Sequence, residues 1–143
     1  MNANTTILLV EDDRYQAELI QLRIGTRCKL IIVDCMLRAV EWLKNNHADA
    51  ILLDVGLPDT ANDLDSIKQI KVVRGKSAIV ILSGNGDPNF IRDAIRSSAN
   101  GFLSKGHGDR TYLDIATEVD KAIENNLTAQ DVHADNKANT GNS

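Results

Sequence analysis

Aromatic residues are scarce in this sequence of 143 residues, in which Phe, Trp and Tyr together account for only 3% of the chain. This scarcity disfavours a flavin-binding electron carrier, and so does the lack of a Gly-, Ser- or Thr-rich loop after the first apolar run that could hold phosphate. Cysteine is also rare. Cys28 and Cys35 are too few for a disulfide framework or a zinc site, so we expect both to be reduced thiols.

Neither an excess of positive charge nor a long apolar run is present. The 16 basic and 20 acidic residues give a net charge of −4, which argues against direct binding of nucleic acid. No apolar run approaches the roughly 18 residues of a membrane span, and the opening MNANTT has no basic segment typical of a secretory signal. These absences favour a cytoplasmic protein that does not cross a membrane.

Five short apolar runs recur along the chain, at residues 7–10, 30–33, 50–53, 78–82 and 101–103. The first four are continuous rather than alternating, which is typical of parallel strands that helices cover on both faces. Between and after the runs, apolar residues recur at helical spacing. These residues are Ala17, Ile20 and Ile24; Ala39, Val40 and Leu43; Leu64, Ile67 and Ile70; Ile91, Ala94 and Ile95; and Ala116, Val119 and Ile123. The pattern predicts an α/β protein, a (βα)5 sandwich around a five-stranded parallel sheet.

Several polar residues mark the ends of the predicted elements. Asp87 before a proline is typical of a helix N-cap, and Asp13 is expected to cap the first helix. Asp34 is interpreted as a cap or a solvated acid. After Asn126 the chain is polar and has no apolar period, so we predict one domain over residues 1–126. Residues 127–143 would then form a disordered tail or the start of a linker.

The polar residues that follow the strands carry the chemistry. Glu11 and Asp12 follow the first run, Asp54 the third, Ser83 the fourth and Lys105 the fifth. In an open parallel sheet, ligands bind outside the carboxyl ends of the strands, so we expect these side chains to converge. Crowded acids repel one another unless a cation is present, and Mg²⁺ prefers such oxygen ligands. With a lysine and a hydroxyl nearby, the pattern indicates phosphoryl transfer to a carboxylate nucleophile.

The motifs ILLVEDD, LLDVGLP, VILSG and GFLSKG follow one another in this order. As a set, over about residues 5–125, they resemble the receiver (CheY-like) domain of two-component response regulators. The resemblance implies a flavodoxin-like, doubly wound fold with strand order 2-1-3-4-5. It also implies a receiver that stands alone, because no second domain fits the sequence.

Roles for individual residues come from this resemblance. Asp54 matches the phosphoacceptor of receivers. Glu11 and Asp12 match the acidic pair that holds Mg²⁺, with Asp54 and the backbone carbonyl of Gly56 as further ligands. Lys105 matches the lysine that pairs with the phosphoryl group.

Two more positions match the part of receivers that responds to the phosphoryl group. Ser83 matches the hydroxyl that hydrogen-bonds it, and Phe102 matches the aromatic switch residue. The resemblance implies a histidine kinase or phosphotransfer protein as donor and an unknown downstream protein as target. Output would come from a changed surface over about residues 87–125, or from passing the phosphoryl group on in a relay. The chain would be a monomer or a phosphorylation-dependent dimer, and it would phosphorylate and dephosphorylate itself rather than turn over substrates.

Two other functions are alternatives to a receiver, and the sequence differs from the receiver pattern at one position after the lysine. The first rival is a degenerate receiver that acts as an interaction module without phosphorylation. The second, an aspartyl phosphatase, needs an acid two residues after the nucleophile, where this chain has Gly56. Gly106 follows Lys105 in place of the proline common in receivers, so no cis peptide is expected there.

Overall fold

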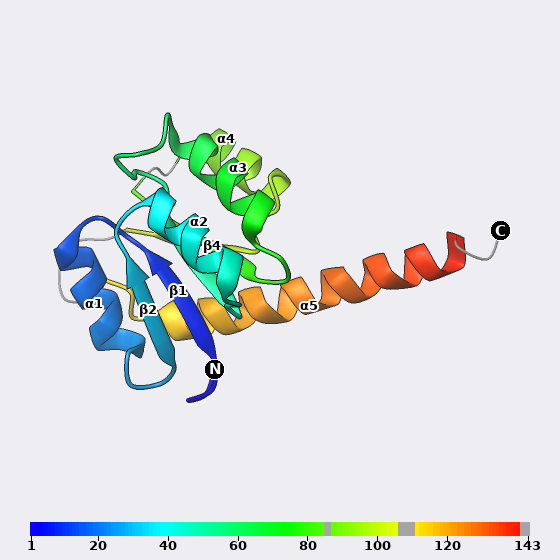
Figure 1. Ribbon diagram of the computed structural model, residues 1–143, viewed down its shortest axis with the longest axis horizontal. Coiled ribbons are helices and arrows are strands. Elements are labelled where there is room, and N and C mark those ends of the chain that lie inside the picture. The colour runs from blue at the N-terminus through cyan, green and yellow to red at the C-terminus, as the bar shows by residue number, and fades with distance from the viewer. Residues whose placement is uncertain (85–86, 106–110, 141–143) are drawn as a thin grey trace.

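Five strands alternate with five helices along the chain in the computed structural model, which describes residues 1–84, 87–105 and 111–140 (Figure 1). Side chains are described as far as Ala129. The elements in order are β1 (Thr6–Val10), α1 (Arg14–Ile24), β2 (Lys29–Val33), α2 (Met36–Asn45), β3 (Ala50–Asp54), α3 (Asp63–Val73), β4 (Ala78–Ser83), α4 (Pro88–Arg96), β5 (Gly101–Ser104) and α5 (Ile115–Thr140). The predicted (βα)5 alternation is confirmed, and each predicted strand lies within the observed one.

The five strands form one parallel sheet with the order β2-β1-β3-β4-β5. The order reverses at β1, because the chain passes from β1 to the edge strand β2 and then returns to β3 on the other side of β1. This topology is the predicted flavodoxin-like fold. All carboxyl ends of the strands lie at the same edge of the sheet, which is where such folds bind ligands.

Each face of the sheet is covered by its own set of helices. On one face α2, α3 and α4 enclose a core, and on the other face α1 and α5 enclose a second core. The residues of β1 alternate between them: Leu8 and Val10 belong to the first core, and Ile7 and Leu9 to the second. Burial on both faces explains why the runs of β1, β3 and β4 are continuously apolar, whereas the edge strand β2 is only partly buried.

Helix α5 packs closely on the sheet at Gly101. A Cβ atom added there would lie 3.3 Å from the Cβ atom of Ala122, so a larger residue would push α5 away from β5. Helix α5 crosses its face of the sheet and then projects beyond the body of the domain (Figure 1). The glycine therefore sets how near this helix lies to the strands.

The ends of two helices match the prediction. Asp13 caps α1 by accepting hydrogen bonds from the backbone N–H groups of Tyr15 and Gln16 at 2.9 and 3.1 Å. Asp87 caps α4 by accepting from the N–H of Asn89 at 2.9 Å, with proline in the first turn. Asp34 is exposed, as expected for a solvated acid, and pairs with a nearby arginine on α2.

Two sequence predictions about helices need correction. Ile95 was placed on the core face of its helix, but it is 56% exposed because α4 buries a narrower stripe around Phe90 and Ala94. The segment after Asn126 was expected to lack regular structure, yet α5 continues to Thr140. Residues 127–140 contain no proline or glycine, and their alanines favour a helix. The domain boundary itself stays a prediction. No helix among the described residues is long and apolar enough to span a membrane.

Candidate functional site

The carboxyl ends of β1 and β3 bring three acids together. Glu11 and Asp12 follow the last residue of β1, and Asp54 is the last residue of β3. These strands are neighbours in the sheet, and one carboxylate oxygen from each acid lies within 4.8 Å of the others. Glu11 and Asp54 are buried, whereas Asp12 is exposed. The expected convergence of the three acids is therefore confirmed.

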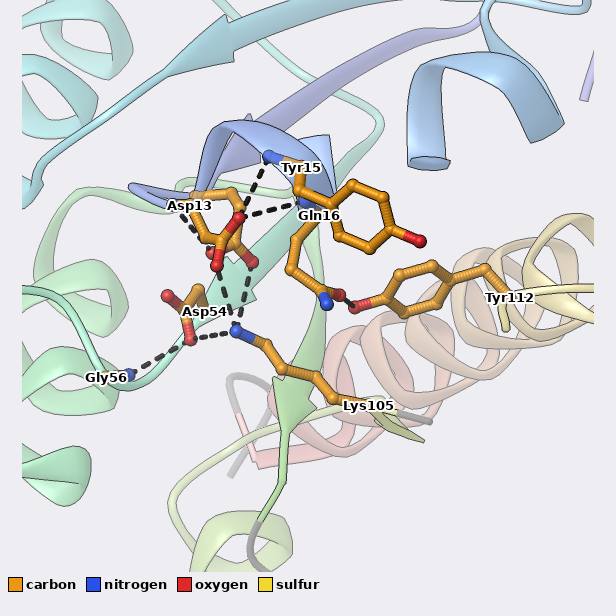
Figure 2. A network of polar contacts seen from close by, with 8 residues as sticks. Asp13, Tyr15, Gln16, Asp54, Gly56, Lys105 and Tyr112 are labelled. Carbon is orange, nitrogen blue, oxygen red and sulfur yellow. Dashed lines mark hydrogen bonds and ion pairs between the residues drawn. The ribbon is translucent and has the colours of Figure 1, made fainter. Parts of the chain in front are cut away.

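Lys105 reaches into this group of acids from the end of β5 (Figure 2). Its Nζ lies 2.9 Å from Oδ1 of Asp54 and 3.2 Å from Oε2 of Glu11. The backbone N–H of Lys105 also donates to the carbonyl oxygen of Ser83 at 2.9 Å, which places it beside the end of β4. Glu11, Asp12, Asp54 and Lys105 are called the acidic cluster below.

Charge in the acidic cluster does not balance, because one ammonium group faces three carboxyl groups. Burial and the neighbouring Asp54 raise the pKa of Glu11 from 4.5 to about 7, although Lys105 opposes the rise. Burial and Asp54 also raise the pKa of Asp12. Burial acts to raise the pKa of Asp54 as well, but hydrogen bonds with Lys105, Asp12 and the Gly56 N–H lower it overall. Asp54 is thus the acid best held in the charged form that a nucleophile needs.

The donor atoms of the acidic cluster fit a hard divalent cation. Carboxylate oxygens are the ligands that Mg²⁺ prefers, and it binds through few of them while keeping waters. Oε2 of Glu11 is buried and accepts no hydrogen bond from the described residues, so its lone pairs face the cluster with only an ion-pair contact. Asp12 leaves the cluster open to solvent on one side. Glu11, Asp12 and Asp54 could therefore hold Mg²⁺, whose charge would relieve their repulsion.

Three other predicted site residues lie around the acidic cluster. Ser83 is the last residue of β4 and is buried. Gly56 is exposed, and its N–H donates to Oδ1 of Asp54 at 3.1 Å (Figure 2). Phe102 is half-buried in β5, with its ring edge-on to that of Phe90 on α4 at a centroid distance of 6.5 Å. Their predicted roles in phosphoryl binding, metal ligation and switching stay predictions.

Asp59 contributes to this end of the sheet and was not predicted from the sequence. Its carboxylate accepts hydrogen bonds from the N–H groups of Met36 and Leu37, at 2.9 and 3.0 Å, in the first turn of α2. Burial acts to raise the pKa of Asp59, but these hydrogen bonds lower it overall. The loop after Asp54 therefore docks on α2 by capping it.

Tyr112 was also missed, although it lies close to the acidic cluster on the α1 side (Figure 2). A tyrosine after a glycine-rich segment has no sequence signal that would place it there, because its contacts are to α1, far away in the chain. Gly106, where no cis peptide was expected, lies outside the described residues.

The fold and the site together define a class. A doubly wound five-stranded parallel sheet that carries three acids and a lysine at its carboxyl edge is a CheY-like signalling domain. The family model of the response regulator receiver domain matches residues 7–117. This chain therefore belongs to the response regulator receiver domain family, whose members work in two-component systems and interact with histidine kinases and downstream effectors.

The curated relatives that match this chain include proteins that are much longer than it. The sensor kinase/phosphatase LuxN of Vibrio harveyi is 32% identical over 105 residues, which are 73% of this chain and 12% of LuxN. The Fimbriae Z protein of Salmonella typhimurium is 27% identical over 103 residues, 70% of this chain and 49% of that protein. The chain therefore spans about half the length or less of these two relatives.

Solved structures share the fold. The receiver domain of a Pseudomonas aeruginosa sensor histidine kinase, which has a magnesium ion in its active-site cleft, has a TM-score of 0.70 and 21% identity. That match covers 85% of this chain and 99% of the other. The receiver domain of an HD domain-containing protein from Pseudomonas fluorescens has a TM-score of 0.75 and 18% identity, over 92% of this chain and 95% of that one.

Proposed function

We propose that this receiver accepts a phosphoryl group on Asp54 from a phosphohistidine of a partner kinase or phosphotransfer protein. The observation that carries the proposal is the contact between Lys105 and the buried Asp54 inside the acidic cluster. Asp54 is the acid of the acidic cluster whose pKa is lowered, so it supplies an ionised nucleophile where neighbouring acids favour a bound cation. A purely structural ion pair would not need two further carboxyl groups beside it.

Different residues of the chain would have different roles in this phosphoryl transfer. An Asp54 carboxylate oxygen attacks phosphorus, and the P–N bond to the donor imidazole breaks as the new P–O bond forms. Glu11 and Asp12 would hold Mg²⁺ together with Asp54 and the Gly56 carbonyl. When bound, Mg²⁺ would neutralise charge on the transferring oxygens. Receiver structures with magnesium in the cleft, such as that of the P. aeruginosa kinase, support this part of the proposal.

Lys105 and Ser83 would then respond to the new group. A phosphoryl group on Asp54 brings about two negative charges and three acceptor oxygens. Lys105 would exchange its contact with Asp54 for a phosphoryl oxygen, and the Ser83 hydroxyl would donate to another. Because the Lys105 N–H is already bonded to the Ser83 carbonyl, the ends of β4 and β5 would move together.

That movement would reach the surface formed by α4, β5 and α5, where Phe102 packs against Phe90. Changed packing of this aromatic pair would bias the surface between two arrangements, and a downstream protein would bind one of them. Passing the phosphoryl group to another protein in a relay is an equivalent output. The match to part of a sensor kinase/phosphatase supports a partner in two-component signalling.

The rival is an interaction module that works without phosphorylation. It requires only the fold, so nothing in it accounts for the buried carboxylate with an ammonium group at 2.9 Å. Labelling with a small phosphodonor separates the two proposals directly.

The test uses acetyl phosphate with Mg²⁺ on the wild-type chain and on Asp54→Ala. We expect the wild type to gain about 80 Da, the mass that one phosphoryl group adds, and to lose it in acid or base, while Asp54→Ala gains nothing. Asp34→Ala is the matched control, since Asp34 also follows a strand but is exposed, pairs with Arg38 and is not one of the three grouped acids. It should label like the wild type. Labelling of Asp54→Ala, or none of the wild type, would refute the proposal.

A further inference from the structure

Tyr112 has an unusual backbone conformation for an aromatic residue. Its φ is +63°, in the left-handed region that residues with bulky side chains rarely adopt. The residue is nevertheless 95% buried, since only 5% of its surface is exposed. Strained backbone of this kind persists where surrounding contacts determine it, and it is frequent at functional sites.

The contact that holds Tyr112 is made with helix α1. Its hydroxyl donates to Oε1 of Gln16 at 2.6 Å, which joins the residues before α5 to the first turn of α1 (Figure 2). About two turns further along α1, Nε of Arg23 donates to the carbonyl oxygen of Thr111 at 3.3 Å. Two residues of α1 thus hold two consecutive residues that lead into α5.

A series of hydrogen bonds continues from Gln16 into the acidic cluster. The backbone N–H of Gln16 donates to Oδ1 of Asp13 at 3.1 Å, and the backbone N–H of Asp13 donates to Oε1 of Glu11 at 3.1 Å. Glu11 in turn contacts Lys105. Tyr112 therefore lies at one end of a connected network whose other end is the group of acids expected to bind metal.

We propose that Tyr112 is a positioning residue for the acidic cluster, because its hydrogen bond to Gln16 holds the turn of α1 that orients Glu11. The inference rests on the proposed function and adds a second connection between the site and α5, separate from Ser83 and Phe102. Since the same contact holds the residues that lead into α5, binding of a cation at the cluster and the position of α5 are coupled. Such coupling acts equally in both directions.

The direction of the effect follows from preorganisation. Without the Tyr112 hydroxyl, the first turn of α1 loses one of the contacts that hold it, and the N–H of Asp13 should hold Glu11 less firmly in one orientation. Groups that orient metal ligands raise affinity because they reduce the ordering that binding requires. Loss of the contact should therefore weaken Mg²⁺ binding without removing any ligand.

The test measures Mg²⁺ affinity by calorimetry for the wild type, Tyr112→Phe, Gln16→Leu and the double variant. We expect each single variant to bind Mg²⁺ about fivefold more weakly, within the range seen for residues that couple sites, and the double variant to be no weaker than either single one. Tyr15→Phe is the matched control, because Tyr15 is the neighbouring tyrosine but its side chain is 60% exposed. Its Mg²⁺ affinity should equal that of the wild type.

Hydrogen exchange adds a readout that a loss of general stability would not reproduce. In the wild type, saturating Mg²⁺ should slow exchange of the amides in the first turns of α5, and in Tyr112→Phe this slowing should be lost. Wild-type affinity in either single variant, or additive losses in the double variant, would overturn the inference. A wild type that neither binds Mg²⁺ nor labels at Asp54 would instead refute the proposed function, which keeps the two failures distinct.

Discussion

Two polar clusters lie at opposite ends of the same sheet, and they differ in how completely their charged groups are paired. At the amino ends of β4 and β5, the Arg74 guanidinium donates to the carbonyl oxygens of Ser77 and Ser98 and to the Oδ1 atoms of Asn100 and Asn126. These four distances lie between 2.8 and 3.0 Å. This Arg74 cluster surrounds one cation with neutral acceptors, and each acceptor gains a partner.

The acidic cluster at the carboxyl ends has the opposite character. Three carboxyl groups compete for one ammonium group, and a buried oxygen of Glu11 accepts no hydrogen bond from the described residues. Full satisfaction of polar groups is what a structural network needs, because an unpaired buried polar group costs free energy. The comparison shows that the chain can complete a polar network, so the unbalanced charge in the acidic cluster is a property of the site.

The largest effect is expected from Arg74→Leu. Because the substitution removes a charged donor from four acceptors and leaves the oxygen of the buried Asn126 with only a long hydrogen bond of 3.4 Å from Asn100, unfolding free energy should fall by about 3 kcal/mol. Urea denaturation measures the change, and Lys71→Ala, an exposed substitution on the same helix, should shift the free energy by less than about 0.5 kcal/mol. Phosphorylation of the folded variant should be normal. A stability loss no larger than that of Lys71→Ala would show that the Arg74 cluster is not structural.

A smaller effect, of characteristic pH dependence, is expected from the acidic cluster. The pKa of Glu11 is raised from 4.5 to about 7 in the folded chain, so between these values the folded state binds more protons than the unfolded state. Unfolding free energy from this group should therefore fall as pH rises through that range, by on the order of 2 kcal/mol.

Glu11→Gln checks this prediction, because an amide does not titrate. The difference in unfolding free energy between wild type and variant should change between pH 4.5 and 7 without Mg²⁺, in the direction that favours the variant at the higher pH. The difference in unfolding free energy between wild type and Arg74→Lys, which keeps both Glu11 and the charge of the other cluster, should show no such slope. If wild type and Glu11→Gln have parallel pH profiles, the repulsion inferred here is absent.

The smallest effect concerns Mg²⁺ itself. A cation that binds only the folded state at ten times its Kd should raise the unfolding free energy by about 1.4 kcal/mol. Asp12→Asn should lose most of this increase because it removes an accessible ligand, whereas Arg74→Leu should keep it. Thermal denaturation with Mg²⁺ and with equal ionic strength of NaCl separates specific binding from screening. Equal stabilisation by both salts would contradict a magnesium site.

The sequence was sufficient for the sheet and for the position of most site residues. Continuous apolar runs identify the strands of a parallel sheet, whose carboxyl ends lie at one edge, so the approach of Glu11, Asp54 and Lys105 followed from their places just after the strands. The strand order came from the family resemblance. The functional roles drawn from the family resemblance are not read from spacing. They stay proposals until labelling tests them.

Residues whose positions depend on distant contacts could not be predicted. Asn126 was taken as the end of the domain because the chain after it is polar, but no local signal indicates that this residue is buried and bonded to Arg74 at the end of α3. Tyr112 adopts a backbone conformation that no local signal indicates, and its partner Gln16 lies 96 residues earlier. Ile95 shows the reverse case, since an apolar residue at helical spacing faces solvent when the helix covers only the edge of the sheet.

Helix α5 is held near both of its ends within the domain, since Tyr112 just before its start is held by α1 and Asn126 within it is held by Arg74. A helix held at these two places moves as a rigid body about the contact that is held more firmly, which is the contact of Asn126 with Arg74. At 1.5 Å per residue, Thr140 lies about 20 Å beyond Asn126 along the helix. If the start of α5 moved towards or away from the acids while Asn126 stayed in place, the helix would tilt about Asn126 and Thr140 would move in the opposite direction.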